Sequence, residues 1–582
     1  MKIIKEQINT YFLIMFMMSV ANLLYLHHYF LLTIALEVDC FKSSIIDNLI
    51  ASLLDVTILL SVIWLATMRR LRISLVITFT ITLIWSFCNA FYARFFHQYL
   101  TWSSIGQISN LSDATVIKSM IAGFQITDLY YPIMIILFCW IIIRSRHYNI
   151  DRKSIRTVLF IWSFCFTLGL SVHSLYFFHP NIGFIYELEK TLFTPQKMDS
   201  MWPNWTVFHK GFFRKLVLEQ LTRDRIIKLN EEQIQKIEKE FSDYRLRKTA
   251  RKTPENIKNI IFILVESYLS VTSDLIIDGK EITPNLNRLK HDSTIYYNGH
   301  MRPNVSIGES ADGQFIYMCG LLPLHSEITT SKAMHNMIWG LPKQLQKVFY
   351  NLKSSTIIPT NPSLWDQQAM SDAYGFTKLY SILDYHNEMK DKEKSSFLND
   401  EMIFRYASFK DESNTSPFFT LILTMSMHQP YDSFEKHGFE ITNKNLPQKY
   451  KNYLNSCHFT DKQIGMYLEK LKNKGLYKNS LIIITADHDA RPRYLDMEGK
   501  ISDDIPIYII NGGFDPSKTW HGECNQLDVY TTILDIMGVD SEWYGLGHTL
   551  LNKDYQNSVT EDMQELSENI IYSNFFNTKK IK

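Results

Sequence analysis

Hydrophobic residues are distributed unevenly along the 582-residue chain, and their distribution separates two regions. Residues 1–180 hold almost all of the long apolar runs, whereas the chain from about residue 210 onward has the mixed pattern of a soluble domain. Five apolar stretches lie near residues 11–33, 46–68, 73–95, 126–144 and 156–178. Because about 20 helical residues cross a bilayer core, each stretch predicts a membrane-spanning helix.

The positions of Lys and Arg around these stretches predict the topology. Basic residues precede the first stretch and lie between the second and third and between the fourth and fifth. The alternate loops, around residues 36–45 and 97–125, are poor in Lys and Arg. By the positive-inside rule the N-terminus is cytoplasmic, and five crossings place the C-terminal region outside. We therefore expect a multi-pass protein of the plasma (inner) membrane with an extracytoplasmic soluble domain.

Two further segments flank the expected soluble domain at residues 255–550. Residues 181–254 begin with Trp, Phe, Lys and Arg side chains that suit an element lying on the membrane surface. They continue with a charged stretch of helical period, which predicts a solvated linker helix. Residues 551–582 are expected to be a C-terminal tail. The predicted domains are thus 1–180, 181–254, 255–550 and 551–582.

Within residues 255–550, short apolar runs alternate with stretches of helical period. The pattern predicts helices at Thr460–Lys474 and Gln526–Met537, among others. It predicts strands at 259–265, 293–299, 354–358, 417–425, 480–485 and 506–510. Such alternation favours a mostly parallel central sheet with helices on both faces.

Two of the predicted strands stop abruptly at side chains that bind metals. Glu266 follows the run Asn259–Val265, and Asp487 and His488 follow the run Leu481–Ala486. Ligands bind at the carboxyl edge of open α/β sheets, so these groups are expected at a ligand site. Taken singly, a strand-end Glu is usually solvated or capping and a loop Ser such as Ser310 usually forms a turn. Their joint occurrence indicates a site.

Two carboxylates, an imidazole and a hydroxyl form a ligand set that suits Zn, Mn or Mg. A divalent ion next to Ser310 would lower the pKa of its hydroxyl and make it a nucleophile. The pattern predicts phosphoryl or sulfuryl transfer.

The formal net charge of +1 shows no nucleic-acid footprint, so no nucleic-acid partner is expected. The seven cysteines have no CxxC spacing, which excludes a metal–thiolate motif of that kind.

Several blocks of the chain resemble, in order, those of the lipoteichoic acid synthase family. They are Asn259–Ser267, Gly308–Asp312, the segment around Trp365, Met427–Tyr431 and Thr485–His488. That family belongs to the sulfatase/alkaline phosphatase superfamily. The resemblance implies an α-helical five-span membrane domain followed by an α/β alkaline-phosphatase/sulfatase-like domain with a mostly parallel central sheet.

The same resemblance implies roles for particular residues. It assigns Glu266, Asp487 and His488 to a divalent metal, with manganese the first expectation and zinc or magnesium as alternatives. Ser310 stands where the family has a nucleophilic Thr that also touches the metal. His428 is similar to the family's substrate-side His and would serve as the general acid at the leaving oxygen.

The chain also departs from the family pattern around Trp365, which is retained as a substrate contact. The family's nearby His, Asn/Asp and Arg fall here on Ile358, Thr360 and Gln367. Because an Arg fork is the natural phosphate clamp, its loss leaves the phosphoglycerol headgroup open. Two other residues are candidates for substrate binding. Arg491 would supply replacement charge or lie on the surface, and His521 resembles a later His that some superfamily members use at a metal or phosphate.

Three classes of function follow from these patterns. The first is a metal-dependent membrane transferase that moves phosphoglycerol or phosphoethanolamine from a phospholipid to a glycan or glycolipid acceptor, through a covalent Ser310 intermediate. The second is a sulfatase-like hydrolase of sulfuric esters or phosphodiesters, although the C/S-x-P-x-R context for formylglycine is missing around Ser310 and Cys319. The third, an inactive membrane protein, is disfavoured by the intact ligand set.

Overall fold

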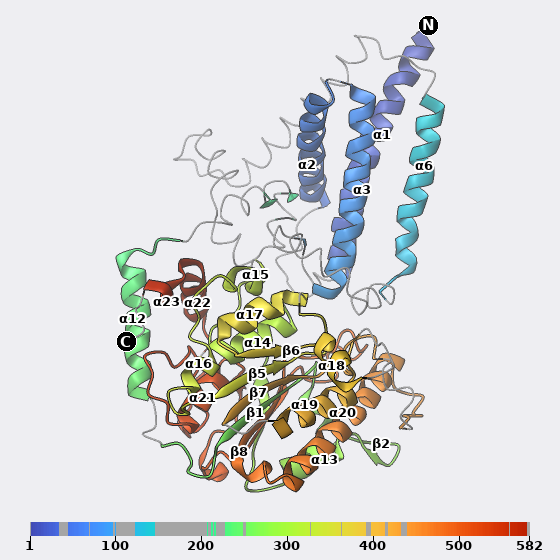
Figure 1. Ribbon diagram of the computed structural model, residues 1–582. Coiled ribbons are helices and arrows are strands. Elements are labelled where there is room, and N and C mark those ends of the chain that lie inside the picture. Colours follow the sequence, from blue (N-terminus) through green and yellow to red (C-terminus); the bar gives the residue numbers. More distant parts are fainter. Residues whose placement is uncertain are drawn as a thin grey trace. The chain divides into compact units, whose positions relative to one another are not determined.

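The computed structural model describes most of the chain and divides it into two compact units. The described residues are 2–33, 45–68, 70–96, 99–100, 123–145, 207, 211–212, 215–216, 227–247, 252–325, 327–362, 364–390, 397–413, 417–431, 439–557 and 559–578. Figure 1 shows an all-helical unit and a larger unit built around a sheet.

Among the residues that the structure describes, the first unit contains four helices that are long and apolar enough to cross a membrane. They are α1 (Lys2–Thr33), α2 (Ile45–Ala66), α3 (Leu71–Phe96) and α6 (Tyr130–Ser145), the last preceded by the 3-10 helix η4 (Ile126–Leu129). Four of the five predicted membrane helices are therefore confirmed as helices of suitable length and composition. The fifth, predicted at 156–178, lies outside the described residues, as does most of the segment predicted to lie on the membrane surface.

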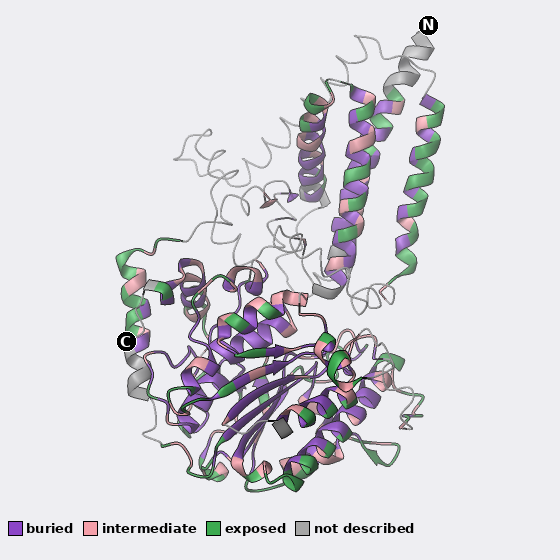
Figure 2. Cartoon of the chain, in the orientation of Figure 1, coloured by how far each residue is buried: buried purple, intermediate pink, exposed green. Residues whose placement is uncertain are grey.

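The exposed and buried side chains of these helices differ in polarity in the way that a lipid environment requires. Figure 2 shows a largely exposed α6, and the exposed apolar side chains Ile133, Ile136, Trp140 and Ile143 suit contact with lipid chains. One buried charge of this unit is paired with an opposite charge, because an isolated charge in a bilayer is costly. Arg94 of α3 forms a buried ion pair with Asp128, and its Nε donates to the hydroxyl of Tyr29 at 2.8 Å.

The second unit contains an eight-stranded sheet in the order β10-β4-β9-β8-β1-β7-β5-β6. Only β9 runs antiparallel to its neighbours, so the expected mostly parallel sheet is confirmed. The strands are β1 (Asn259–Val265), β4 (Tyr296–Arg302), β5 (Lys353–Ile357), β6 (Lys378–Tyr380), β7 (Phe418–Leu423), β8 (Ser480–Ala486), β9 (Ile505–Ile510) and β10 (Cys524–Asn525). A separate two-stranded pair joins β2 (Ile276–Ile277) to β3 (Lys280–Glu281). All six predicted strands are present, and the short β2, β3, β6 and β10 escaped prediction.

Helices cover both faces of this sheet (Figure 1). One layer contains α13 (Pro284–Lys290), α19 (Asp400–Ser413) and α20 (Gln448–Asn473). The opposite layer contains α14 (Ser310–Cys319), α15 (Thr329–Ala333), α16 (Leu341–Leu345), α17 (Gln367–Tyr374) and α21 (Asp528–Ile536). The remaining short helix α18 (Ile382–Met389) follows β6. Because both faces are covered, the central strands β1 and β8 are buried at every position, which explains their unbroken apolar sequences.

The register of β1 and β8 aligns the ends of the two strands. Val265 pairs with Ala486 in the parallel ladder. The next residues along the chain, Glu266 and Asp487, therefore leave the sheet side by side. On the other side of β1, the strand β7 lies in register with Ile263 opposite Ile422, and it ends at the same edge of the sheet.

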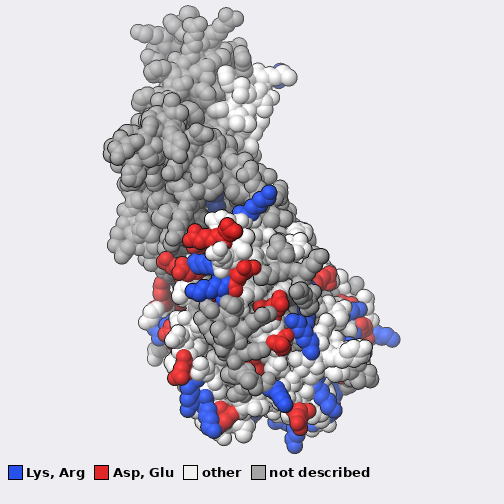
Figure 3. All heavy atoms as spheres, turned by 90° about the vertical axis from the view of Figure 1, so that its left-hand side faces the viewer, with Lys and Arg blue, Asp and Glu red and all other residues white. Residues whose placement is uncertain are grey.

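Two segments outside the predicted soluble domain belong to its core. The helix α12 (Glu231–Arg247), expected to be a solvated linker, buries Ile237 and Phe241. The residues assigned to a C-terminal tail include α22 (Glu561–Ser573) and α23 (Phe575–Thr578), which bury Leu566 and Phe576 in the same core. The predicted linker helix is present and mostly exposed, but a few apolar residues at helical spacing suffice to dock it and the C-terminal helices to this core. On the side shown in Figure 3, Lys and Arg side chains are interspersed with Asp and Glu side chains among the described residues. An exposed ion pair between Lys236 and Asp562 joins α12 to α22.

Candidate metal and nucleophile site

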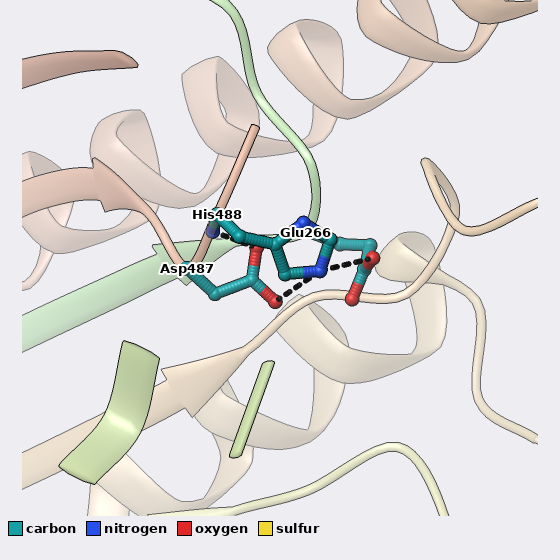
Figure 4. Close-up of side chains that lie close together, drawn as sticks. All are labelled: Glu266, Asp487 and His488. Atoms are coloured by element: carbon teal, nitrogen blue, oxygen red, sulfur yellow. Dashed lines mark hydrogen bonds and ion pairs between the residues drawn. The ribbon is translucent and has the colours of Figure 1, made fainter. Parts of the chain in front are cut away.

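Glu266, Asp487 and His488 come together where β1 and β8 end. One ligand atom from each of the three residues lies within 4.8 Å of the others, and all three are buried. Figure 4 shows the imidazole of His488 between the two carboxylates. The Nε2 atom of His488 is 3.4 Å from Oε1 of Glu266 and 3.7 Å from Oδ2 of Asp487. This is the cluster that the strand ends predicted.

The second ring nitrogen of His488 is hydrogen-bonded to the protein backbone. Its Nδ1 lies 2.7 Å from the carbonyl oxygen of Asp489, which can only accept a hydrogen bond. Nδ1 is therefore the donor, and Nε2 is directed to the carboxylates as a potential ligand. A backbone carbonyl behind a ligating imidazole is the usual way in which a protein fixes the tautomer at a metal centre.

Ser267 connects the two carboxylates, and sequence reasoning missed it. Its backbone N–H donates to Oδ1 of Asp487 at 2.8 Å, and its hydroxyl donates to Oε1 of Glu266 at 2.7 Å. The His488 N–H also donates to Oδ1 of Asp487, so this oxygen is engaged while Oδ2 faces the imidazole. The only sequence signal for Ser267 was its place directly after the strand-end Glu266.

Ser310 is the first residue of α14, and its hydroxyl points into the cluster. Its Oγ lies 3.2 Å from Oε2 of Glu266 and 3.2 Å from Nε2 of His488. The start of a helix presents unpaired backbone N–H groups and a positive potential, which favour an anion or a developing alkoxide. The structure thus joins the predicted nucleophile to the three predicted ligands.

Close packing of α14 against the end of β8 sets this distance. A Cβ on Gly313 would collide with the carbonyl oxygen of Asp487, so only glycine allows the approach. Asp312 holds the loop before the helix, because its Oδ2 accepts the N–H groups of Ser306 and Gly308 at 2.9 Å each. Burial raises the pKa of Asp312 to about 7.

The buried cluster shifts the proton affinities of its own members. Burial, followed by the charge of Glu266, raises the pKa of Asp487 to about 7. Burial alone would lower the pKa of His488, but the charges of Asp487 and Glu266 raise it well above its ordinary value. Burial alone would raise the pKa of Glu266, as it does that of Asp487. The hydrogen bond and the charge of His488 outweigh burial and hold the pKa of Glu266 below its usual range. A cation binding here would have to displace protons from the cluster.

His428 and Trp365 follow the next two strands of the sheet. His428 comes after β7, which is adjacent to β1, and its charge contributes to lowering the pKa of Glu266. Its Nδ1 lies 2.7 Å from the carbonyl oxygen of Gln429 and must donate to it, so Nε2 is the other functional atom. Trp365 follows β5, is half-buried, and has left-handed backbone with φ 54°. His428 lies beyond the carboxyl end of the strand next to β1, and Trp365 lies beyond the end of β5, one strand further from the cluster.

The two remaining predicted substrate-binding residues have different surroundings. Arg491 forms an ion pair with Glu309, the residue before Ser310, and so lies next to the site. His521 is exposed, and its ring nitrogens lie against the carbonyl oxygens of Tyr297 at 3.0 Å and Pro516 at 2.8 Å. The structure does not bring His521 into the group of potential metal ligands found among the described residues.

The three positions where the chain departs from the family pattern are all buried and uncharged. Ile358, Thr360 and Gln367 have exposed fractions of 1%, 5% and 7%.

Sequence reasoning also missed Gln526, whose Nε2 donates to the carbonyl oxygen of Asp487 at 2.7 Å and thereby fixes the end of β8. No local motif marks Gln526, because its partner is 39 residues away.

The donor set fits a divalent cation. It combines two carboxylate oxygens, an imidazole nitrogen with a fixed tautomer and a serine hydroxyl, all converging at the end of a sheet. Such hard-to-borderline ligands suit Mn, Zn or Mg, and the set offers no thiolate that would select soft metals. A cation here would bring a nucleophile and an electrophilic centre into one site.

Comparison with known proteins agrees with this geometry. The sulfatase family matches residues 258–539. Lipoteichoic acid synthase 2 of Bacillus subtilis (strain 168) is 27% identical over 320 residues, which are 51% of this chain and 48% of that protein. Lipoteichoic acid synthase 1 of the same organism is 24% identical over 523 residues, which are 84% of this chain and 76% of that protein. The chain thus matches about half the length of the first relative and about three quarters of the second.

Among solved structures, the lipooligosaccharide phosphoethanolamine transferase A (EptA) of Neisseria meningitidis shares the fold. The TM-score is 0.52 at 12% identity, and the match covers 95% of this chain and 98% of that one. These findings confirm the resemblance to the lipoteichoic acid synthase family and the sulfatase-like fold that the sequence blocks predicted.

Proposed function

We propose that this chain, a membrane relative of lipoteichoic acid synthases with a sulfatase-family domain, transfers a phospho-alcohol headgroup from a phospholipid to a cell-envelope acceptor. The headgroup is phosphoglycerol or phosphoethanolamine, and the acceptor is a glycan or glycolipid. The observation that carries the proposal is the position of Ser310, whose hydroxyl is 3.2 Å from both a carboxylate and an imidazole of a potential metal site.

Glu266, Asp487, His488 and Ser310 would hold the divalent cation, with manganese the first expectation. When bound, such an ion supplies a positive charge that lowers the pKa of a neighbouring hydroxyl and offsets charge on phosphate oxygens. The chain's own residues hold the reacting groups in place. Ser267 keeps the two carboxylates together, and the Asp489 carbonyl keeps the His488 tautomer.

In the first step, the Ser310 oxygen attacks the phosphorus of the lipid and forms a new O–P bond. Its proton is released to solvent, since the Glu266 carboxylate that accepts the Ser310 hydrogen bond has a pKa below its usual range and would itself hold the cation. The bond between phosphorus and the diacylglycerol oxygen breaks, and protonated His428 gives its proton to that leaving oxygen. Diacylglycerol departs, and the headgroup remains as a phosphodiester on Ser310.

In the second step, an acceptor hydroxyl attacks from the vacated side. Neutral His428 takes the acceptor proton while the new O–P bond forms. The Ser310–phosphorus bond breaks, and the Ser310 oxygen regains a proton from solvent. The two steps return every residue to its starting state. A hydrolase would differ by using water in place of the acceptor.

Four membrane-length apolar helices support the assignment of a lipid donor, since a donor in the bilayer is concentrated in two dimensions around an anchored enzyme. We place the N-terminus in the cytoplasm and the sulfatase-like domain outside the plasma membrane, on the pattern of basic loops. This topology puts the site on the side where envelope glycans are found.

The test is to reconstitute the full-length protein with Mn or Zn in vesicles of phosphatidylglycerol or phosphatidylethanolamine, and to measure the mass of the peptide that contains Ser310. We expect an increment equal to one phospho-headgroup with one of the two lipids, and none in Ser310→Ala. An unmodified Ser310 with both lipids, together with turnover of a soluble phosphate or sulfate ester, would overturn the transferase in favour of a hydrolase.

A further inference from the structure

An ion pair outside the ligand set joins the nucleophile to the metal-binding loop. Glu309, directly before Ser310, pairs through Oε1 with Nη2 of Arg491, which lies three residues after His488. The side chains are 15% and 22% exposed, so water screens the pair only partly. The second carboxylate oxygen of Glu309 is 3.8 Å from Nδ1 of His488.

The backbone at both ends of this ion pair is unusual. Glu309 has φ 47° and ψ −116°, and Arg491 has φ 47°. Residues with a Cβ seldom adopt positive φ, and such conformations persist only where the surroundings hold them. At Glu309 the conformation turns the chain sharply into α14, so that Ser310 begins the helix facing the cluster. The ion pair is one of the contacts that tie this turn to the opposite loop.

The contacts around the pair close a ring. Ser310 Oγ contacts His488 Nε2 at 3.2 Å, and His488 Nδ1 donates to the Asp489 carbonyl at 2.7 Å. The Asp489 carboxylate accepts the Arg491 N–H at 2.9 Å, and the Arg491 guanidinium returns to Glu309, the neighbour of Ser310. Each member of the ring limits the movement of the next. The ring therefore sets the position of Ser310 relative to His488 by contacts of the chain alone.

We propose that Glu309 and Arg491 are positioning residues whose ion pair clamps Ser310 against the metal-binding loop. The role of Arg491 in the mechanism rests on the proposed transferase function, and it differs from direct binding of the substrate phosphate. The pairing also neutralises Glu309, whose free negative charge would repel a phosphodiester beside the nucleophile. Arg491 is thereby engaged by the protein and acts through Glu309.

The test compares Glu309→Gln, Arg491→Met, Arg491→Lys and the double variant Glu309→Gln/Arg491→Met in the full-length protein. The matched control is Asp496→Asn, which removes an exposed ion pair with Lys449 from the same loop region. Two readouts are required: the Mn²⁺ dissociation constant from electron paramagnetic resonance of the free ion, and the separate kcat and KM for headgroup transfer.

A clamp predicts that Glu309→Gln and Arg491→Met each lower kcat about 10- to 100-fold and weaken Mn²⁺ binding about tenfold, with KM nearly unchanged. The double variant should be no worse than either single variant, and Arg491→Lys should recover part of kcat. Asp496→Asn should match the wild type. The melting temperature of each variant separates a misfolded protein from a misaligned one, and a variant that has lost its fold is replaced by the milder Arg491→Lys.

The opposite pattern would overturn the clamp. If Arg491 binds substrate phosphate, Glu309→Gln frees its guanidinium and lowers KM, while Arg491→Met raises KM and leaves Mn²⁺ affinity unchanged. Should the wild type bind Mn²⁺ but transfer no headgroup, the proposed function fails while the Mn²⁺ affinities of the variants still decide the clamp. Mn²⁺ affinities equal to wild type in both single variants would then count against it.

Discussion

The hydroxyl of Ser310 lies 3.2 Å from Nε2 of His488, although 178 residues separate them in the chain. The contact forms because β8 ends at Asp487 and α14 begins where Gly313 can pack against that strand end. The proposed nucleophile and the proposed metal ligand therefore share one rigid junction of strand and helix. Rigid elements hold reacting groups more precisely than loops do, and the predictions below depend on that junction.

Removal of the Ser310 hydroxyl should abolish transfer while the fold remains. We expect Ser310→Ala to lower the rate at least about 10³-fold, because the variant lacks the proposed nucleophile. Ser310→Thr keeps the hydroxyl and should remain within about an order of magnitude of wild type. Headgroup transfer from labelled phospholipid measures both. Wild-type rates in Ser310→Ala would contradict a covalent route.

Loss of one ligand should weaken metal binding selectively. His488→Ala removes the only imidazole in the potential ligand group of the described residues, so we expect Mn²⁺ affinity to fall at least about tenfold. His521→Ala is the matched His variant, because His521 lies exposed against backbone carbonyls. Its Mn²⁺ affinity should equal that of wild type. Equal losses in the two variants would show that His521 also reaches the ion.

Metal affinity should rise with pH. Burial and the Glu266 charge raise the pKa of Asp487 to about 7, and neighbouring carboxylates raise the pKa of His488. Below about pH 7 protons occupy these ligand atoms, so Mn²⁺ must displace them to bind. Each displaced proton strengthens binding by about tenfold per pH unit over the range where it is still bound. Calorimetry at pH 6, 7 and 8, in buffers of different ionisation enthalpy, measures affinity and proton release; a constant affinity would argue against these groups as ligands.

A methyl group at Gly313 should separate α14 from β8. The Cβ of Gly313→Ala would meet the Asp487 carbonyl oxygen, and such overpacking costs about 1–3 kcal/mol. We expect a lower melting temperature together with weaker Mn²⁺ binding and slower transfer. Gly475→Ala is the comparison, since no atom lies within 4 Å of a Cβ there although φ is +70°. That variant should lose stability only, and unchanged Mn²⁺ affinity in Gly313→Ala would refute the role of this packing.

The C-terminal helices should be required for stability. Phe576 is 2% exposed and stacks on Trp339 with ring centroids 5.1 Å apart. We expect Phe576→Ala to destabilise the second unit by about 3–5 kcal/mol, because it leaves a cavity between aromatic rings. The exposed Glu565→Ala on α22 should change stability by no more than about 0.5 kcal/mol. Thermal unfolding in detergent measures both, and equal effects would indicate a loosely attached tail.

Most of the candidate site residues that the sequence predicted were identified from their positions at the ends of predicted strands. Glu266, Asp487 and His488 could be predicted because each follows an apolar run that only a buried strand explains. Ser310 could not be placed by such a pattern, and only the order of sequence blocks connected it with the ligands. The ion pair of Glu309 with Arg491 had no signal at all, because contacts between residues 182 apart leave no local periodicity.

The same distinction explains why the sequence did not predict that α12 docks to the core. The helix α12 carries many charges, and its pattern is that of a solvated helix, yet Ile237 and Phe241 dock it to the core. A helix needs only a narrow apolar stripe when aromatic residues from elsewhere complete the contact, as Trp543 does with Phe241 at 4.9 Å between ring centroids. Docking depends on a partner surface that the helix's own residues do not encode.

By itself, the sequence determined the apolar membrane helices, the mostly parallel sheet and the ligand-type residues at its strand ends, since each depends on the local periodicity of side chains. Only the tertiary structure decided that Val265 pairs with Ala486, that Ser310 faces His488, and that Arg491 is engaged by Glu309. Strand register, helix approach and long-range ion pairing are set by how packed surfaces fit together. Their free energy arises from contacts between distant segments, which no window of sequence contains.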